Sequence, residues 1–205
     1  MPISSLDDLY LHKLIMIHDA EQRALAAYPA LVEEIEDEEL RRAMQVHMTE
    51  TEQQVADLRT LLDESGGDQL VMACESMQAL IDETTRMIAE IDDPDTLHAY
   101  LIGAAQAMEH HEIAAYGTVR AWAEQLGRDE DIVVLDRILE QEKATDAILT
   151  TLAERHVNRE AATADREVSL ELGRDDDGMA ADDDADDLAD ADTSRRGAAR
   201  QDEAR

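Results

Sequence analysis

The run AMEHHEIAAYG at residues 107–117 decides the fold, because it sets two glutamates and two histidines among residues suited to burial. On a helix, Glu109 and Glu112 lie on neighbouring turns of one face, so at least one carboxylate must approach whatever that face packs against. An unpaired buried carboxylate costs several kcal/mol, and a metal ion is one of the few partners that can accept two. The run therefore predicts a long helix with an acidic site in its buried face.

Helical periodicity extends in both directions from this run, and no segment alternates as a strand would. We expect five helices, over residues 6–35, 38–63, 70–91, 96–126 and 129–156. The segment SSLDD should cap the first helix and Gly127 should close the fourth, while Pro29 should kink the first helix or end its first half. The third segment lets the second and fourth helices run in the same direction, as in bundles with a long crossover connection. The predicted fold class is all-α.

The domain organisation follows from a change of composition near residue 158. Residues 1–158 are predicted to form one helical domain. From residue 159 to residue 205, short acidic clusters replace the large apolar residues, which predicts a disordered tail. Truncation at Asn158 should therefore leave the bundle folded, because the tail lacks the apolar surface to offset its ordering entropy.

The chain is strongly acidic, with 50 Asp and Glu against 18 Lys and Arg and a net charge of −32. This excess argues against nucleic acid and anionic membrane surfaces as partners. Self-repulsion of this size is screened in molar salt, so the composition is typical of halophiles. The sequence shows no signal peptide and no stretch of about 18 apolar residues that could span a bilayer. A cytoplasmic protein is expected.

Each of the four long predicted helices presents acids on or beside its apolar stripe. They are Glu21 on the first, Glu50 beside the stripe of the second, Glu109 and Glu112 on the fourth, and Glu142 with Asp146 on the fifth. A single acid of this kind is more often a boundary residue than a ligand. Four like charges in an aliphatic core would repel and desolvate one another, whereas two divalent cations would neutralise them. The pattern is that of carboxylate-bridged di-iron or di-manganese bundles.

Other polar residues are weaker candidates. His47 could be a metal ligand or a hydrogen-bonded core residue. Successive residues turn by about 100° on a helix, so at most one of His110 and His111 can reach the metals, and we favour His110. Tyr116 could donate to a ligand, although core packing is its more ordinary role. Cys74, the single cysteine, is interpreted as a small buried apolar residue, since no histidine or basic residue lies near it in sequence.

Five runs, in order along the chain, resemble the YciE/YciF family of ferritin-like stress proteins. They are DAEQRAL (19–25), HMTETEQQVADL (47–58), CESMQALIDE (74–83), MEHHEIAAYGTVRAWAEQLG (108–127) and LEQEKATDAILT (139–150). The resemblance covers about residues 3–155 and, with the acidity, indicates a haloarchaeal-type member. It implies a ferritin-like four-helix bundle with an additional crossover helix, a homodimer, and a di-metal centre related to that of rubrerythrin.

The resemblance also implies a ligand set. Carried over residue by residue, its members are Glu21, Glu50, Glu109, Glu112, Glu142 and Asp146, with Gln54 at a position where some members have histidine. The fifth helix offers Thr145 and Asp146 in place of a Glu-x-x-His pair. The site is therefore rich in acids and poor in nitrogen, which favours harder ions.

Three functions are consistent with this sequence. The first is a di-metal oxidoreductase with two iron or manganese ions and ferroxidase or peroxidase-type chemistry. The second is a dimeric structural or interaction protein whose site is vestigial or filled by Mg²⁺. The third is a carrier of metal or solute. The shortage of histidine favours the second function, and the family resemblance favours the first.

Overall fold

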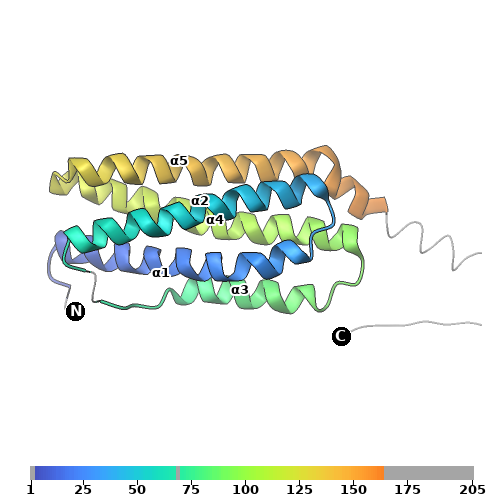
Figure 1. The fold of residues 1–205 in the computed structure, drawn as a ribbon, viewed down its shortest axis with the longest axis horizontal. Helices are drawn as coiled ribbons and strands as arrows, with labels where there is room; N and C mark the ends of the chain where they lie inside the picture. Colours follow the sequence, from blue (N-terminus) through green and yellow to red (C-terminus); the bar gives the residue numbers. More distant parts are fainter. Residues whose placement is uncertain (1–2, 68–69, 164–205) are drawn as a thin grey trace, which may run out of the picture.

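Four long helices form the bundle in the computed structural model: α1 (Leu6–Glu33), α2 (Glu38–Glu64), α4 (Pro94–Leu126) and α5 (Asp129–Leu152) (Figure 1). A shorter helix, α3 (Glu75–Ile88), packs along α1 and α4. The structure describes residues 3–67 and 70–163, and no strand occurs within these ranges. The predicted all-α, ferritin-like four-helix bundle with an additional crossover helix is confirmed.

The connection through α3 sets the directions of the helices. Helices α2 and α4 run in the same direction, because the segment between them crosses the length of the bundle (Figure 1). Each long helix therefore packs against two antiparallel neighbours: α1 contacts α2 and α4, and α5 contacts α2 and α4. None of the helices described is long and apolar enough to cross a membrane.

The helix ends follow local chemistry. The Ser5 hydroxyl accepts a 3.0 Å hydrogen bond from the Asp8 amide, which caps α1 as predicted. Gly127 ends α4 with a φ of 69°, a left-handed conformation that favours glycine. Helix α1 continues through Pro29 to Glu33, so the expectation that proline ends its first half is wrong. Pro29 is exposed, and the ring therefore displaces no buried side chain.

The C-terminal end of the bundle extends further than predicted. After α5 the chain forms a π-helical turn, η1 (Ala153–Val157), and remains helical through residues 158–163. Val157 is buried, and His156 Nε2 lies 2.8 Å from Asp37 Oδ2, so this turn is fixed to the start of α2. The predicted boundary at residue 158 thus falls inside a helix, which alanine and glutamate continue by their helix propensity. Residues 164–205, the rest of the predicted tail, lie outside the described residues.

The core consists of two hydrophobic clusters separated by polar side chains. One cluster joins the second half of α1 with the starts of α2 and α4, and includes Leu40 and Met108. The other joins the first half of α1 with the ends of α2 and α4, and includes Leu14 and Val119. Between them lies the polar layer, which we define as Glu21, His47, Thr51, Gln54, Glu109, Glu112, Glu142 and Thr145. The fold thus places a set of ionisable groups in the middle of an otherwise aliphatic bundle.

Candidate metal centre

The polar layer is closed to solvent. Each of its eight side chains belongs to a residue that is at most 6% exposed. They come from all four long helices, because each helix replaces one to three apolar stripe positions at the same height. Burial of four carboxylates in one layer is costly unless protons or cations accompany them.

His47 lies at the centre of one side of the polar layer. Its Nε2 atom is 2.9 Å from the Tyr28 hydroxyl and 3.0 Å from Glu109 Oε1, the latter without hydrogen-bond geometry. Its Nδ1 atom is 3.2 Å from the Thr145 hydroxyl. In the tautomer with the proton on Nδ1, Thr145 accepts it and the Nε2 lone pair faces Glu109. The Tyr28 hydroxyl can donate to Nε2 in this tautomer, while the close approach of Glu109 is balanced by a proton on its carboxyl group or by a cation. A metal-binding histidine is commonly held in this way by its other ring nitrogen.

Two of the carboxylates are held by neutral donors. The Tyr116 hydroxyl donates a 2.5 Å hydrogen bond to Glu21 Oε1. The Gln54 amide donates a 2.5 Å hydrogen bond to Glu142 Oε1. Tyr116 therefore donates to a candidate ligand, whereas the sequence favoured core packing as its more ordinary role. These contacts fix the orientation of each carboxylate without neutralising its charge.

Five buried carboxylate oxygens accept no hydrogen bond from a hydroxyl, amide or cationic group of any residue that the structure describes, although the carboxyl groups of Glu109 and Glu142 lie close enough to share a proton. They are both oxygens of Glu109, both oxygens of Glu112, and Oε2 of Glu142. Buried polar atoms are nearly always satisfied in native proteins, so unsatisfied ones call for a partner such as an ion. Their concentration at one height of the bundle is the strongest feature of this structure.

The electrostatics of the polar layer follow from burial. Burial is the main cause that raises the pKa of Glu21 to about 8, and the charge of Glu142 adds to it. Burial is likewise the main cause that raises the pKa of Glu142 to about 9, and the charge of Glu109 adds to it. Burial also raises the pKa of Glu109 and Glu112. Without a cation, these groups therefore retain protons near neutral pH.

The donor set suits a divalent cation. Ligand atoms of His47, Glu109, Glu112 and Glu142 all lie within 4.8 Å of one another. Three carboxylates and one imidazole are the ligand types of iron, manganese and related ions in helical bundles. Glu21 lies beside this group, as its influence on the pKa of Glu112 shows. The residues present therefore fit a metal centre.

The structure brings six of the nine predicted site residues into the polar layer and leaves three outside. The six are Glu21, His47, Gln54, Glu109, Glu112 and Glu142. Glu50 is half-buried beside the layer. His110 is exposed and lies 3.3 Å from Asp146, which is half-buried and accepts a 2.9 Å hydrogen bond from Gln106. A rotation of about 100° from Glu109 carries His110 to the surface.

The sequence predicted no hydrogen-bonding role for three hydroxyl groups in or beside this layer, those of Tyr28, Thr51 and Thr145. The Tyr28 and Thr145 hydroxyls contact opposite nitrogens of His47. The Thr51 hydroxyl donates to the His47 carbonyl within α2. The signal was available in part, because Tyr and Thr at stripe positions each carry a hydroxyl that needs a partner when buried.

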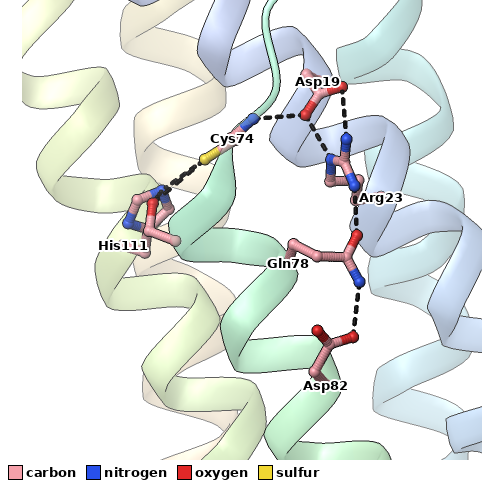
Figure 2. A network of polar contacts seen from close by, with 7 residues as sticks. Asp19, Arg23, Cys74, Gln78, Asp82 and His111 are labelled. Carbon is pink, nitrogen blue, oxygen red and sulfur yellow. Dashed lines mark hydrogen bonds and ion pairs between the residues drawn. The ribbon is translucent and has the colours of Figure 1, made fainter.

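Cys74 lies in a separate polar network between α1, α3 and α4 (Figure 2). It is buried as predicted, but its Sγ atom lies 3.5 Å from His111 Nε2, a partner 37 residues away in sequence. Its amide donates to Asp19, which also binds Arg23. Burial alone would raise the pKa of the thiol, but the contacts with His111 and Ser76 outweigh it and bring the pKa to about 7. Cys74 is thus a small buried residue, as predicted, and also a hydrogen-bonded thiol, which the sequence did not indicate.

A second group of potential ligands lies at the end of the bundle. Ligand atoms of Asp37, His156 and Glu160 also lie within 4.8 Å of one another. Asp37 caps α2, where one of its oxygens accepts hydrogen bonds from the amides of Glu39 and Leu40. The other oxygen lies 2.8 Å from His156. This group is explained by its structural contacts and has none of the orphaned oxygens of the polar layer.

Known proteins share this sequence and architecture. Residues 5–162 match the family described as "Domain of unknown function (DUF892)". Protein YciF of Escherichia coli (strain K12) is 35% identical over 162 residues, which cover 78% of this chain and 98% of YciF. The crystal structure of the E. coli stress protein YciF matches with a TM-score of 0.70 at 34% identity, covering 76% of this chain and 99% of that one.

Two further solved structures are similar. YcfI from Rhodopseudomonas palustris, described as a candidate structural protein, matches with a TM-score of 0.70 at 36% identity, covering 73% of this chain and 95% of that one. A protein from Xanthomonas campestris pv. campestris matches with a TM-score of 0.60 at 23% identity, covering 80% of this chain and 99% of that one. At that identity the last similarity concerns the fold alone.

Proposed function

The chain belongs to the DUF892 family, and from its buried carboxylate cluster we propose that it is a ferritin-like stress protein that binds divalent metal ions. The observation that carries this proposal is the set of five carboxylate oxygens that accept no hydrogen bond from the described residues. A structural role alone would be served better by apolar residues, because unpaired buried charges destabilise a core. The E. coli relative is described as a stress protein.

We propose two ions, iron or manganese, in the polar layer. Four carboxylates can neutralise two divalent cations, and His47, Glu109, Glu112 and Glu142 would hold one of them. Glu21 would complete the set for the second. Such ions, when bound, supply redox and Lewis-acid chemistry, including the ferroxidase or peroxidase type. The chain itself orients the carboxylates through Tyr116 and Gln54 and excludes water from the layer.

The alternative proposal is a non-catalytic bundle that binds Mg²⁺ or no ion. It is favoured by the donor set, which has one imidazole in place of the two that Glu-x-x-His pairs would supply. The description of the Rhodopseudomonas relative as a candidate structural protein points the same way. Oxygen-dependent formation of Fe(III), followed by absorbance after adding Fe(II) to the metal-free protein, separates the two functions.

The metal proposal is tested by titrating metal-free protein with Mn²⁺ in a calorimeter, in molar KCl. We expect about two ions per chain. Glu112→Gln removes a charge without breaking a hydrogen bond, because both Glu112 oxygens are orphaned. It should weaken binding at least tenfold, since losing even a supporting contact of a metal ligand typically costs about 10- to 100-fold. The control is Glu52→Gln, an exposed acid on α2; equal affinities of the two variants would contradict the proposal.

Two properties implied by the sequence accompany this proposal. We propose that the chain forms a homodimer, as the family resemblance implies, and that its acidity adapts it to high salt. Light scattering during size-exclusion chromatography measures the first. Melting temperature as a function of KCl concentration measures the second, and a flat salt response would contradict it.

A further inference from the structure

A groove between α2 and α5 approaches the polar layer from the surface. It has a volume of about 440 Å³. Ten residues line it: Glu39, Arg42, Ala43, Val46, His47, Glu50, Ala144, Thr145, Ile148 and Leu152. His47 and Thr145 belong to the polar layer, so the groove ends at His47, which contacts Glu109, and at Thr145, which contacts His47.

Two other cavities lie next to the polar layer, and neither has room for a hydrated ion. The one beside Glu112, lined also by Cys74 and His111, has essentially no free volume. The one beside Tyr28 has a volume of about 10 Å³, at the lower limit for a single water molecule. The inner hydration shell of a divalent ion, taken as six waters of about 30 Å³ each, occupies about 180 Å³. The α2–α5 groove is therefore the only one of these three cavities that can hold a divalent ion with its inner hydration shell.

Glu50 occupies the wall of this groove, three residues from His47 on the same face of α2. Of the two acids in the groove, Glu39 forms an ion pair with Arg155, which occupies its charge. The charge of Glu50 acts on the polar layer, since it adds to burial and to nearer acids in raising the pKa of Glu109. Val46 and Ile148, 56% and 50% exposed, form an apolar rim that offers a cation no ligands. Glu50 is thus the acid best placed to receive an ion.

We propose that the α2–α5 groove is the port through which a hydrated divalent cation reaches the polar layer, with Glu50 as its first carboxylate and the pair His47–Thr145 as the gate. This proposal rests on the proposed metal-binding function. Glu50 is not among the clustered ligand atoms, and the port explains why an acid nevertheless stands beside them. It also predicts that changes in the groove alter rates of metal exchange rather than affinity.

The first test narrows the groove. Loading is followed by mixing metal-free protein with Mn²⁺ and a fluorescent chelator dye that reports free Mn²⁺. Ala144→Trp adds a large side chain to the groove wall at an exposed position. The matched control is Ala107→Trp, an exposed position in the groove of about 380 Å³ between α3 and α4. We expect Ala144→Trp to slow loading about tenfold or more, and Ala107→Trp to load like the parent.

The second test removes the charge of Glu50. Because a cation is attracted to this carboxylate on its way in, Glu50→Gln should slow loading about three- to tenfold and reduce its dependence on salt. Release to excess chelator should also slow, so the equilibrium dissociation constant for Mn²⁺ should change much less than the loading rate, by only the small amount that the charge of Glu50 exerts on the layer. Glu52→Gln is the control for lost charge on α2. A Glu50→Gln variant that binds Mn²⁺ much more weakly, at an unchanged loading rate, would make Glu50 a ligand and overturn the port.

The outcomes separate the two proposals. If the parent takes up no divalent ion, the proposed function fails and the port fails with it. If the parent binds Mn²⁺ and both Ala144→Trp and Glu50→Gln load at the parent rate, the port alone is refuted. Circular dichroism of each variant establishes that it is folded before its rate is compared.

Discussion

Replacing Glu142 by glutamine should change how the stability of the metal-free protein depends on pH. Burial raises the pKa of Glu142 from 4.5 to about 9, and the charge of Glu109 adds to the effect. An acid with a raised pKa in the folded state binds a proton that the unfolded chain releases. Its contribution to stability is therefore fully present below about pH 4.5 and is lost as the pH rises toward about 9. The parent protein without metal should become less stable over this range.

The size of the effect follows from linkage. One proton bound on folding changes the free energy of unfolding by about 1.4 kcal/mol per pH unit. Between pH 5 and pH 8 this gives at most about 4 kcal/mol for a single group, and we expect about 2–4 kcal/mol because Glu21, Glu109 and Glu112 share the protons of the layer. Glutamine has the same shape and keeps a carbonyl to accept from Gln54, but it has no charge. Glu142→Gln should therefore be more stable than the parent, by a margin that grows with pH.

The assay is urea denaturation of parent and variant at several pH values from 5 to 8, in molar KCl with EDTA, followed by helical circular dichroism. A gain of about 2–4 kcal/mol is a large part of a typical domain stability of about 5–15 kcal/mol, so it is measurable. Glu52→Gln, which removes an exposed acid, should follow the parent at every pH. If Glu142→Gln also follows the parent, the carboxylates are not buried without partners in solution. With Mn²⁺ present the order should reverse, because the variant has lost a proposed ligand.

Three further outcomes are expected. Tyr116→Phe removes the donor to Glu21 and should lower the free energy of unfolding by about 1–3 kcal/mol in the same urea assay; an unchanged value would show that this contact is absent in solution. The ultraviolet absorbance of the thiolate should titrate Cys74 with a midpoint near a pKa of about 7, and His111→Phe should move that midpoint upward, whereas an unchanged midpoint would contradict the role of His111. Gly127→Ala introduces a side chain at a φ of 69° and should cost about 1 kcal/mol in thermal unfolding; a neutral result would contradict the strain.

Much of the fold could be predicted because helical periodicity is a local property. Stripe positions three and four residues apart identified the buried faces, and acids on those faces identified Glu21, Glu109, Glu112 and Glu142 as inward residues. Helix ends were less certain. The third helix begins at Glu75 rather than near Leu70, because the preceding residues extend along α1 and the Cys74 amide bonds to Asp19 instead of starting a helical turn earlier.

The remaining differences between the predicted and the observed side-chain positions arise where a small rotation about the helix axis, or a contact between distant segments, sets the position. Glu50 and Asp146 lie next to stripe positions, and a single residue step of about 100° moves a side chain from the core to its edge. No local pattern relates Cys74 to His111, since Cys74 directly precedes α3 and His111 lies on α4, so the two meet only when α3 packs on α4. Likewise, the Tyr28 hydroxyl contacts His47 across a helix pair.

The position of the polar layer argues that it exists for binding rather than for stability. It separates two hydrophobic clusters that would form one continuous core if Glu112 and Glu142 were apolar, so the acids remove apolar contacts at a fully buried height of the bundle. Their ionised forms are also costly in this position, as the raised pKa of Glu142 shows. Neutral donors hold single oxygens of Glu21 and Glu142, yet no donor from residues 3–67 or 70–163 reaches Glu112. A sequence selected only for a stable bundle would replace such a residue, whereas one that binds divalent cations requires it.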